Sequence, residues 1–182
     1  EQDTRRFASF AKVPVFDPAT PEQGYAMIQE AFEVSERYGT PVIVRPTTRV
    51  DHASTFFELH ETTEARPLPE GGFVRDDKWI IFPRRAYQAH GEIKERLAQV
   101  AVDSSEGTFN PAEQVGENPT VGIVCGGVST QYVREALGIL AETVDLPAYR
   151  FLQVGTPYPF PQEAALRFAD GLERIIVFEE LD

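Results

Sequence analysis

The chain has 182 residues, 42% of them hydrophobic, and its 29 acidic and 17 basic side chains give a formal charge of −12. This length and composition predict one or two folded domains with real cores and exclude a disordered chain. So acidic a surface repels phosphate backbones, which excludes nucleic acid as a partner. The single cysteine excludes an internal disulfide and a cysteine-based metal or cluster site, and it suits the reducing cytoplasm. No apolar run reaches the roughly 20 residues that cross a bilayer, so we expect no membrane association.

The first third of the chain predicts two helix–strand steps. They are expected over residues 6–12, 13–16, 20–39 and 42–45. The second helix has the clearest signals, because Thr20 is a good N-cap, Pro21 suits the first helical position and Gln23 completes a capping box. Gly39 then ends this helix. The short step from the helix to the next strand is typical of a layered α/β domain.

The middle of the chain is less regular. We expect an extended segment at 55–61, irregular structure at 62–78, one long helix at 84–105 and a linker at 109–119. The long helix is predicted because its apolar side chains recur at intervals of three and four residues.

The last third predicts strands alternating with helices. The strands are expected at 120–125, 149–155 and 174–180, and the helices at 129–143 and 161–172. Short links between these elements predict an α/β fold with a parallel sheet and right-handed crossovers.

A turn between a strand and a helix contains two consecutive glycines, Gly126 and Gly127, followed by Ser129. Glycines allow close backbone approach, and a helix N-terminus carries partial positive charge, so the turn is a candidate anion site. It lacks the full dinucleotide and P-loop motifs. The alternative, which we favour on composition, is an ordinary βα turn capped by Ser129.

A dense polar segment follows the strand at 42–45. It consists of Arg45, Thr47, Thr48, Arg49, Asp51 and His52. Ligands of open α/β sheets gather at the carboxyl ends of strands, so these side chains are candidates for holding a carboxylate or a phosphate. A solvated loop, in which Arg49 pairs with Asp51, explains the composition equally well.

Two further features have simple structural explanations. Cys125 precedes a helix, as a catalytic thiol does, but a small buried cysteine is commoner. Acidic residues close the chain, namely Glu179, Glu180 and Asp182. Paired acids serve metal or acid–base chemistry, although a charged exit from a strand is the better interpretation.

Four separated stretches resemble a known enzyme family. They cover residues 1–18, 30–54, 121–137 and 175–182. In the same order, and with similar spacing, they are similar to the alpha subunit of indolepyruvate ferredoxin oxidoreductases, which are thiamine-diphosphate-dependent 2-oxoacid:ferredoxin oxidoreductases. The resemblance implies that this chain is an internal fragment of such a subunit.

The resemblance also implies a division into domains. Residues 1–60 would be the C-terminal half of a pyrimidine-binding domain, which is part of the thiamine-diphosphate-binding fold. Residues 61–114 would connect it, through the long helix, to a transketolase C-terminal-like domain at 115–182. That last domain is expected to be a three-layer α/β domain with a parallel sheet.

The implied reaction is oxidative decarboxylation of indolepyruvate or another arylpyruvate to an acyl-CoA, with electrons passing to ferredoxin. The parent protein would use thiamine diphosphate, Mg²⁺ and iron–sulfur clusters, and its partners would be a beta subunit, ferredoxin, coenzyme A and the 2-oxoacid. We expect the fragment to be inactive alone, to bind none of these cofactors and to self-associate. The alternative is a non-catalytic α/β module that binds an anion or a partner.

The resemblance assigns no catalytic residue and no metal ligand to this chain. It places Arg49 and His52 at the rim of the substrate and cofactor cleft, or at a domain interface, with Gln2, Asp3 and Arg5 nearby. Their expected role is recognition of the substrate carboxylate or positioning of that interface.

Overall fold

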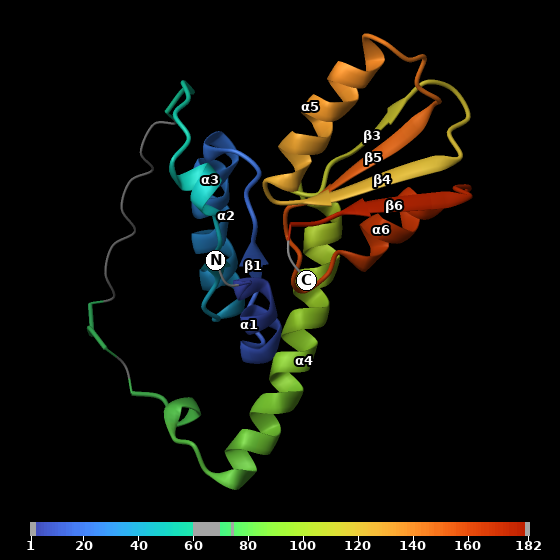
Figure 1. Ribbon diagram of the computed structural model, residues 1–182. Coiled ribbons are helices and arrows are strands. Elements are labelled where there is room, and N and C mark those ends of the chain that lie inside the picture. Colours follow the sequence, from blue (N-terminus) through green and yellow to red (C-terminus); the bar gives the residue numbers. More distant parts are fainter. Residues whose placement is uncertain (1–2, 60–69, 74, 181–182) are drawn as a thin grey trace.

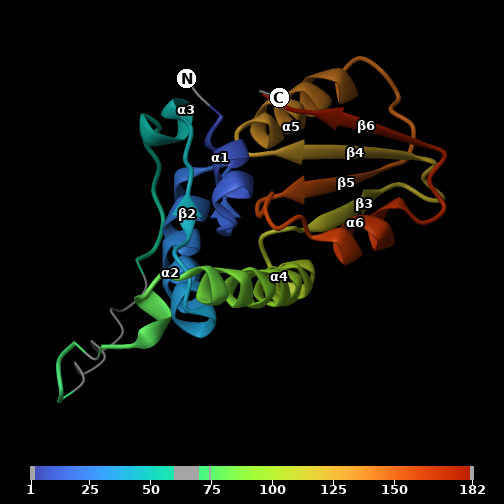
Figure 2. The same cartoon turned by 90° about the horizontal axis from the view of Figure 1, so that it is seen from below.

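The computed structural model describes residues 3–59, 70–73 and 75–180. A small two-stranded sheet and a larger four-stranded sheet lie side by side, and a long helix, α4, reaches both (Figure 1). In Figure 2 the strands β4, β5 and β6 all point toward the N-terminal unit, so the carboxyl ends of the larger sheet face the smaller one.

The N-terminal unit contains the small sheet. Its elements are α1 (Thr4–Ala11), β1 (Val15–Phe16), α2 (Pro21–Tyr38), β2 (Ile43–Val44) and α3 (Thr48–Asp51), and β1 pairs with β2 in parallel. The capping signals of α2 are confirmed: the Thr20 hydroxyl accepts from the Gln23 backbone N–H at 3.2 Å, and Gly39 is left-handed with φ 57°. The Gln23 side chain accepts from the backbone N–H of Ala19 at 2.8 Å, one residue earlier than a standard capping box.

The middle of the chain contains one long helix. A 3₁₀ turn, η1 (Asp77–Trp79), comes before α4 (Pro83–Glu106), so the predicted long helix is confirmed. The expected strand at 55–61 is wrong for residues 55–59, which form no helix or strand; residues 60–61 lie outside the described residues. This apolar segment has no neighbouring strand to pair with among the described residues.

The C-terminal unit is a sheet with helices on both faces. Its elements are β3 (Ala112–Val115), β4 (Val121–Gly126), α5 (Ser129–Ala141), β5 (Tyr149–Val154), α6 (Gln162–Ala169) and β6 (Arg174–Phe178). The strand order is β3-β5-β4-β6; β4 is parallel to β5 and to β6, which confirms the expected parallel pairing. The linker expected at 109–119 is wrong at 112–115, because β3 pairs antiparallel with β5 and makes the sheet mixed.

Side chains alternate between the two faces of this sheet. Ile123 and Phe151 pack toward α5, while Leu152 and Val154 form a second cluster with Phe168 of α6. The result is a helix–sheet–helix arrangement, and α4 lies beside α6 on the same face (Figure 2). Within the described ranges, none of the helices has the length and apolar character needed to cross a membrane.

Candidate functional site at the seam between the sheets

Charged and glycine residues from four strand ends and from the start of α1 meet where the two sheets face each other. We call this group the seam; its members are Asp3, Arg5, Asp17, Arg45, Gly126, Gly127 and Glu179. Asp17 directly follows β1 and Arg45 follows β2, while Gly126 ends β4 and Glu179 follows β6. The carboxyl ends of parallel strands lie at one edge of a sheet, so the topology brings these residues together.

An ion-pair network holds the seam. Asp17 is fully buried, and the Arg45 Nη1 donates to its two carboxylate oxygens at 3.2 and 3.3 Å. Arg5 Nη1 lies 2.7 Å from Glu179 Oε1 and 3.7 Å from Asp17 Oδ2. The Arg5 guanidinium also binds the Asp3 carboxylate in a bidentate pair at 2.9 and 2.8 Å. One arginine thus connects carboxylates from three parts of the chain.

The electrostatics of the seam differ from one group to the next. Burial raises the pKa of Asp17 to about 6, although Arg45 and Arg5 oppose the shift. The hydrogen bond from Arg5 lowers the pKa of Asp3. Burial opposes the charge of Arg5, but hydrogen bonds to Asp3 and Glu179 outweigh it and raise the pKa of its guanidinium. Asp17 is therefore the group in the network whose charge changes at mildly acidic pH.

The two glycines of the β4–α5 turn lie against the carboxylates of the seam. A Cβ atom on Gly127 would be 2.8 Å from Asp17 Oδ1, and a Cβ on Gly126 would be 3.1 Å from Glu179 Oε2. Gly127 also has a positive φ of 45°. Because carboxylates of the chain itself approach this turn, a bound phosphate would meet their negative charge. The anion-turn hypothesis stays a prediction, and the local charge opposes it.

Uncharged hydrogen bonds lie beside the ion pairs, and one of them, between Gln153 and Gln23, joins the two units. The Asn110 side chain accepts from the backbone N–H groups of Gly155 and Thr156 at 3.0 and 3.1 Å and donates to the Thr156 hydroxyl at 2.6 Å. Gln153 of β5 donates to Gln23 of α2 at 2.7 Å.

Backbone contacts complete this joint. The N–H of Asp17 donates to the carbonyl of Gly155 at 2.8 Å, and Val15 forms a bridge with Tyr158. The seam is therefore a continuous joint of backbone, amide and ionic contacts.

Three buried polar atoms beside the seam have no hydrogen-bond partner in the described part of the chain. They are Nη2 of Arg45 and the hydroxyls of Thr47 and Thr130. Leaving such groups unpaired costs about 1–3 kcal/mol each, so this end of the molecule has unused hydrogen-bonding capacity.

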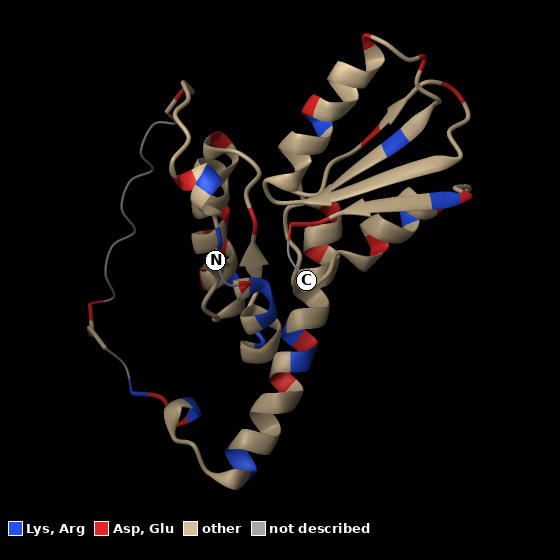
Figure 3. Ribbon diagram, in the orientation of Figure 1, with Lys and Arg blue, Asp and Glu red and all other residues tan. Residues whose placement is uncertain are grey.

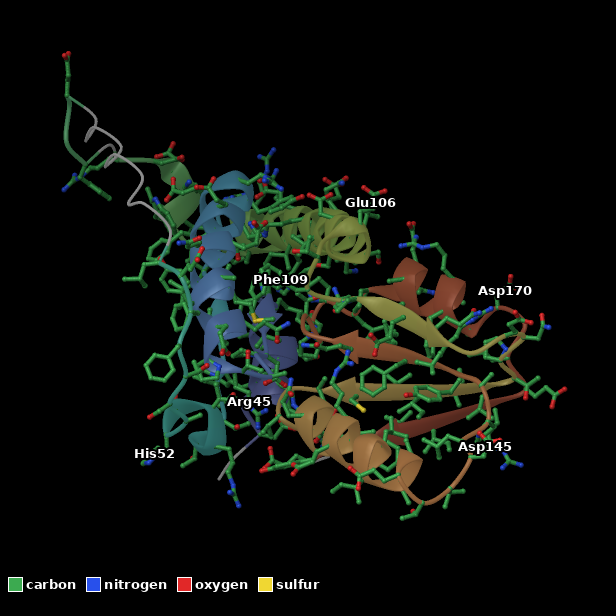
Figure 4. All side chains as sticks on the ribbon, turned by 90° about the horizontal axis from the view of Figure 1, so that it is seen from above. Arg45, His52, Glu106, Phe109, Asp145 and Asp170 are labelled. Atoms are coloured by element: carbon green, nitrogen blue, oxygen red, sulfur yellow. The ribbon has the colours of Figure 1, made fainter. Side chains whose placement is uncertain are left out.

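The residues predicted from sequence are distributed over two places. Asp3 and Arg5 lie in the seam with Gly126 and Gly127, whereas Gln2 lies outside the described residues. Arg49 and His52 lie on or just after α3 and are exposed; Figure 4 shows His52 at the periphery and Arg45 further inside.

The βα turn is not capped as the sequence suggested. Ser129 is the first residue of α5 and is buried, while Val128 occupies the N-cap position without a side-chain cap. Sequence reasoning did not select Asp17 or Glu179 as members of the site. The signal that could have found them is that each acid directly follows a strand.

Neither Cys125 nor the described acids Glu179 and Glu180 form a reactive or metal site. Cys125 is fully buried, and burial together with the nearby Glu179 charge raises the pKa of its thiol to about 11, which opposes a nucleophilic role. Among the described residues, no three His, Cys, Asp or Glu side chains are placed to hold a metal ion. One buried thiol does not fit an iron–sulfur cluster, which needs several thiolate ligands.

Comparisons with known proteins place the chain among its relatives. No protein-family model matches it. Indolepyruvate oxidoreductase subunit IorA from Thermococcus kodakarensis is 36% identical over 186 residues, and the subunits from Methanothermobacter thermautotrophicus and Archaeoglobus fulgidus are 33% and 31% identical. This chain is a relative of part of IorA. Each alignment covers the whole of this chain but only 28% of the IorA subunit, so the chain spans little more than a quarter of the length of these curated relatives.

A solved structure supports the fold of this IorA-like chain. The 2-oxoglutarate:ferredoxin oxidoreductase from Magnetococcus marinus, solved with 2-oxoglutarate, coenzyme A and succinyl-CoA bound, aligns with a TM-score of 0.56. The alignment covers 90% of this chain and 34% of that one at 18% identity, which is evidence for the fold alone. The α/β fold class and the resemblance found in the sequence are both confirmed.

Proposed function

We propose that this IorA-like chain is part of a cytoplasmic enzyme that oxidatively decarboxylates indolepyruvate or another aryl 2-oxoacid to an acyl-CoA and passes the electrons to ferredoxin. The observation that carries the proposal is the 31–36% identity to IorA subunits across the full length of the chain. Thiamine diphosphate, Mg²⁺ and the iron–sulfur clusters of the enzyme would be held by polypeptide outside the described residues, since these residues do not fit a cluster and oppose a diphosphate at the glycine turn.

In this proposal the seam is a rigid joint and not a reaction centre. Residues 1–60 would be the C-terminal half of a pyrimidine-binding domain, residues 61–114 the connecting segment, and residues 115–182 the transketolase C-terminal-like domain. Support comes from the Arg5–Glu179 ion pair, the hydrogen bond from Gln153 to Gln23 and the backbone hydrogen bond from Asp17 to Gly155, which tie the two sheets together. A joint of this kind fixes distances between groups carried by the two domains, as catalysis by positioning requires.

Arg49 and His52 have a different role in the proposal. Both are exposed near the carboxyl end of β2, outside the ion-pair network of the seam. An exposed arginine there can bind the carboxylate of a 2-oxoacid in a bidentate pair, with the imidazole beside it. These residues would form the rim of the substrate cleft in the complete enzyme.

The 182-residue chain provides the first test. Calorimetry with thiamine diphosphate and Mg²⁺ is expected to show no binding, and indolepyruvate, coenzyme A and a viologen dye are expected to give no reduction. Micromolar binding of thiamine diphosphate would contradict the proposed division of labour.

The second test uses the complete enzyme with its partner subunit. Arg49→Met is expected to raise the KM for the 2-oxoacid by about tenfold or more, the loss of roughly one charged hydrogen-bonded contact, with a smaller change in kcat. Lys94→Met, at an exposed position on α4, is the control and should leave both constants unchanged. If both variants behave alike, Arg49 does not contact the substrate.

A further inference from the structure

An arm with exposed aromatic side chains projects from the molecule. We define the arm as residues 75–87, which include η1 and the first turn of α4, at the lower end of the view in Figure 1. Its five large apolar side chains are between 51% and 84% exposed; they are Trp79, Ile80, Ile81, Phe82 and Tyr87. Clustered large apolar side chains of this kind mark an interaction surface.

The arm is also a basic segment of an acidic protein. Residues 75–85 carry four basic side chains, Arg75, Lys78, Arg84 and Arg85, against Asp76 and Asp77, a net charge of +2 in a chain of −12. Figure 3 shows the basic residues at the start of α4. Aromatic rings with arginine and lysine around them are the composition of a binding hot spot, and their charge selects an acidic partner.

A second surface of the same chain has the complementary chemistry. We call it the α2 face; it consists of Ile28, Phe32, Glu33 and Glu36, which are all exposed. Ile28, Phe32 and Glu36 recur every four residues and therefore lie along one side of the helix. Phe32 is 69% exposed. An apolar stripe with carboxylates at one end matches the rings and basic groups of the arm.

The arm and the α2 face remain exposed in the single chain, so they do not cover each other within one molecule. We propose that the arm of one copy docks on the α2 face of a second copy, and that the second arm does the same in return. Two such contacts, related by a two-fold axis, form a closed dimer and leave no arm or face free for further growth. Trp79 and Phe82 would pack on Ile28 and Phe32, with Arg84 near Glu36.

The dimer is tested with the 182-residue chain by sedimentation velocity. The native chain is expected to be a dimer at about 100 μM, and the double variant Trp79→Ser/Phe82→Ser a monomer, with association weakened by about tenfold or more. Leu166→Ser on α6, where the side chain is 63% exposed, is the matched control and should remain dimeric. Since the arm is exposed, unchanged circular dichroism will show that the variants fold. A native chain that stays monomeric overturns the proposal.

Mixing distinguishes the reciprocal contact from other dimers. Phe32→Ser should also give a monomer, and mixing it with the arm variant should restore dimers, because one intact arm then meets one intact α2 face. Charge exchange gives the same information: Arg84→Glu should weaken association and the added change Glu36→Arg should restore it. If Phe32→Ser remains dimeric, the arms bind something other than the α2 face, and the proposal is wrong. The outcome does not depend on the proposed enzyme activity.

Discussion

The seam buries charged side chains, whereas the arm exposes aromatic ones, so each reverses the usual distribution of residues in a folded protein. In the seam the charges come from strand ends and from the start of α1, and each is paired with an opposite charge, as in the contact of Asp17 with Arg45. In the arm four of the five large apolar residues are consecutive, and no described part of the chain covers them. Buried charge that is paired belongs to the interior of one chain, while exposed apolar surface points to a partner.

The largest expected effect comes from removing a charge from the seam. Arg45→Met leaves the Asp17 carboxylate buried without its main partner and should lower the free energy of unfolding by about 3–5 kcal/mol at pH 7. At pH 5 the loss should be smaller, because Asp17 then takes up a proton. Urea denaturation at the two pH values measures both.

A matched control is the exposed pair of Arg134 and Glu113, at 2.6 Å. Glu113→Gln should cost only about 0–1 kcal/mol, as exposed pairs do. If both variants lost the same free energy of unfolding, the Asp17–Arg45 pair would contribute no more than an exposed ion pair.

The pH dependence of stability tests the same group without removing the arginine. Burial raises the pKa of Asp17 from 3.8 to about 6, so the folded state holds this proton more tightly than the unfolded state. Asp17 therefore contributes stability below about pH 4 that is lost as the pH rises through 6, by about 3 kcal/mol. Asp17→Asn should flatten that part of the curve. An unchanged curve would show that Asp17 titrates normally.

Two glycine substitutions compare the β4–α5 turn, which lies against the seam, with the exposed middle of α5. Gly127→Ala should lower the free energy of unfolding by about 2 kcal/mol, because the residue has a positive φ and its new Cβ would approach Asp17 Oδ1. Gly138→Ala, in α5 with open space around it, should raise stability by up to about 1 kcal/mol. Thermal denaturation of both variants measures the change in the free energy of unfolding. A change of the same sign in both variants would contradict the close contact between Gly127 and Asp17.

The smallest effect on stability is expected in the arm. Tyr87→Ser should change the free energy of unfolding of the dilute chain by less than about 0.5 kcal/mol, because the side chain is exposed. The same change should weaken association, measured by sedimentation. A large loss of stability in the dilute chain would show that the arm packs within its own molecule.

Local signals in the sequence predicted the elements that depend on neighbouring residues. Capping residues were sufficient to place α2, which begins after Thr20 and ends at Gly39. The spacing of apolar residues was sufficient to predict α4, and the alternation of strands and helices was sufficient to predict the elements from β4 to β6. β3 was missed because its four residues are exposed and it is a strand only through pairing with β5. The extended segment expected at 55–61 is not a strand at 55–59 for the opposite reason, since an extended segment without a partner does not make a sheet.

The candidate site could likewise be predicted only in part from the sequence. The resemblance directed attention to Asp3 and Arg5, which lie in the seam. The contacts of Asp17 with Arg45 and with Gly127 join residues 28 and 110 positions apart, so no local pattern could show them. The sequence did mark Arg45 as part of a polar segment, but its burial and its pairing with Asp17 are visible only in the folded chain.

Cys125 lies at the end of β4, fully enclosed between the sheet and α5. Because it is the only thiol in the chain, a sulfhydryl reagent can modify the protein at one place alone, and only when that enclosure opens. The rate of modification therefore reports how often the centre of the larger sheet becomes accessible, without any engineered label.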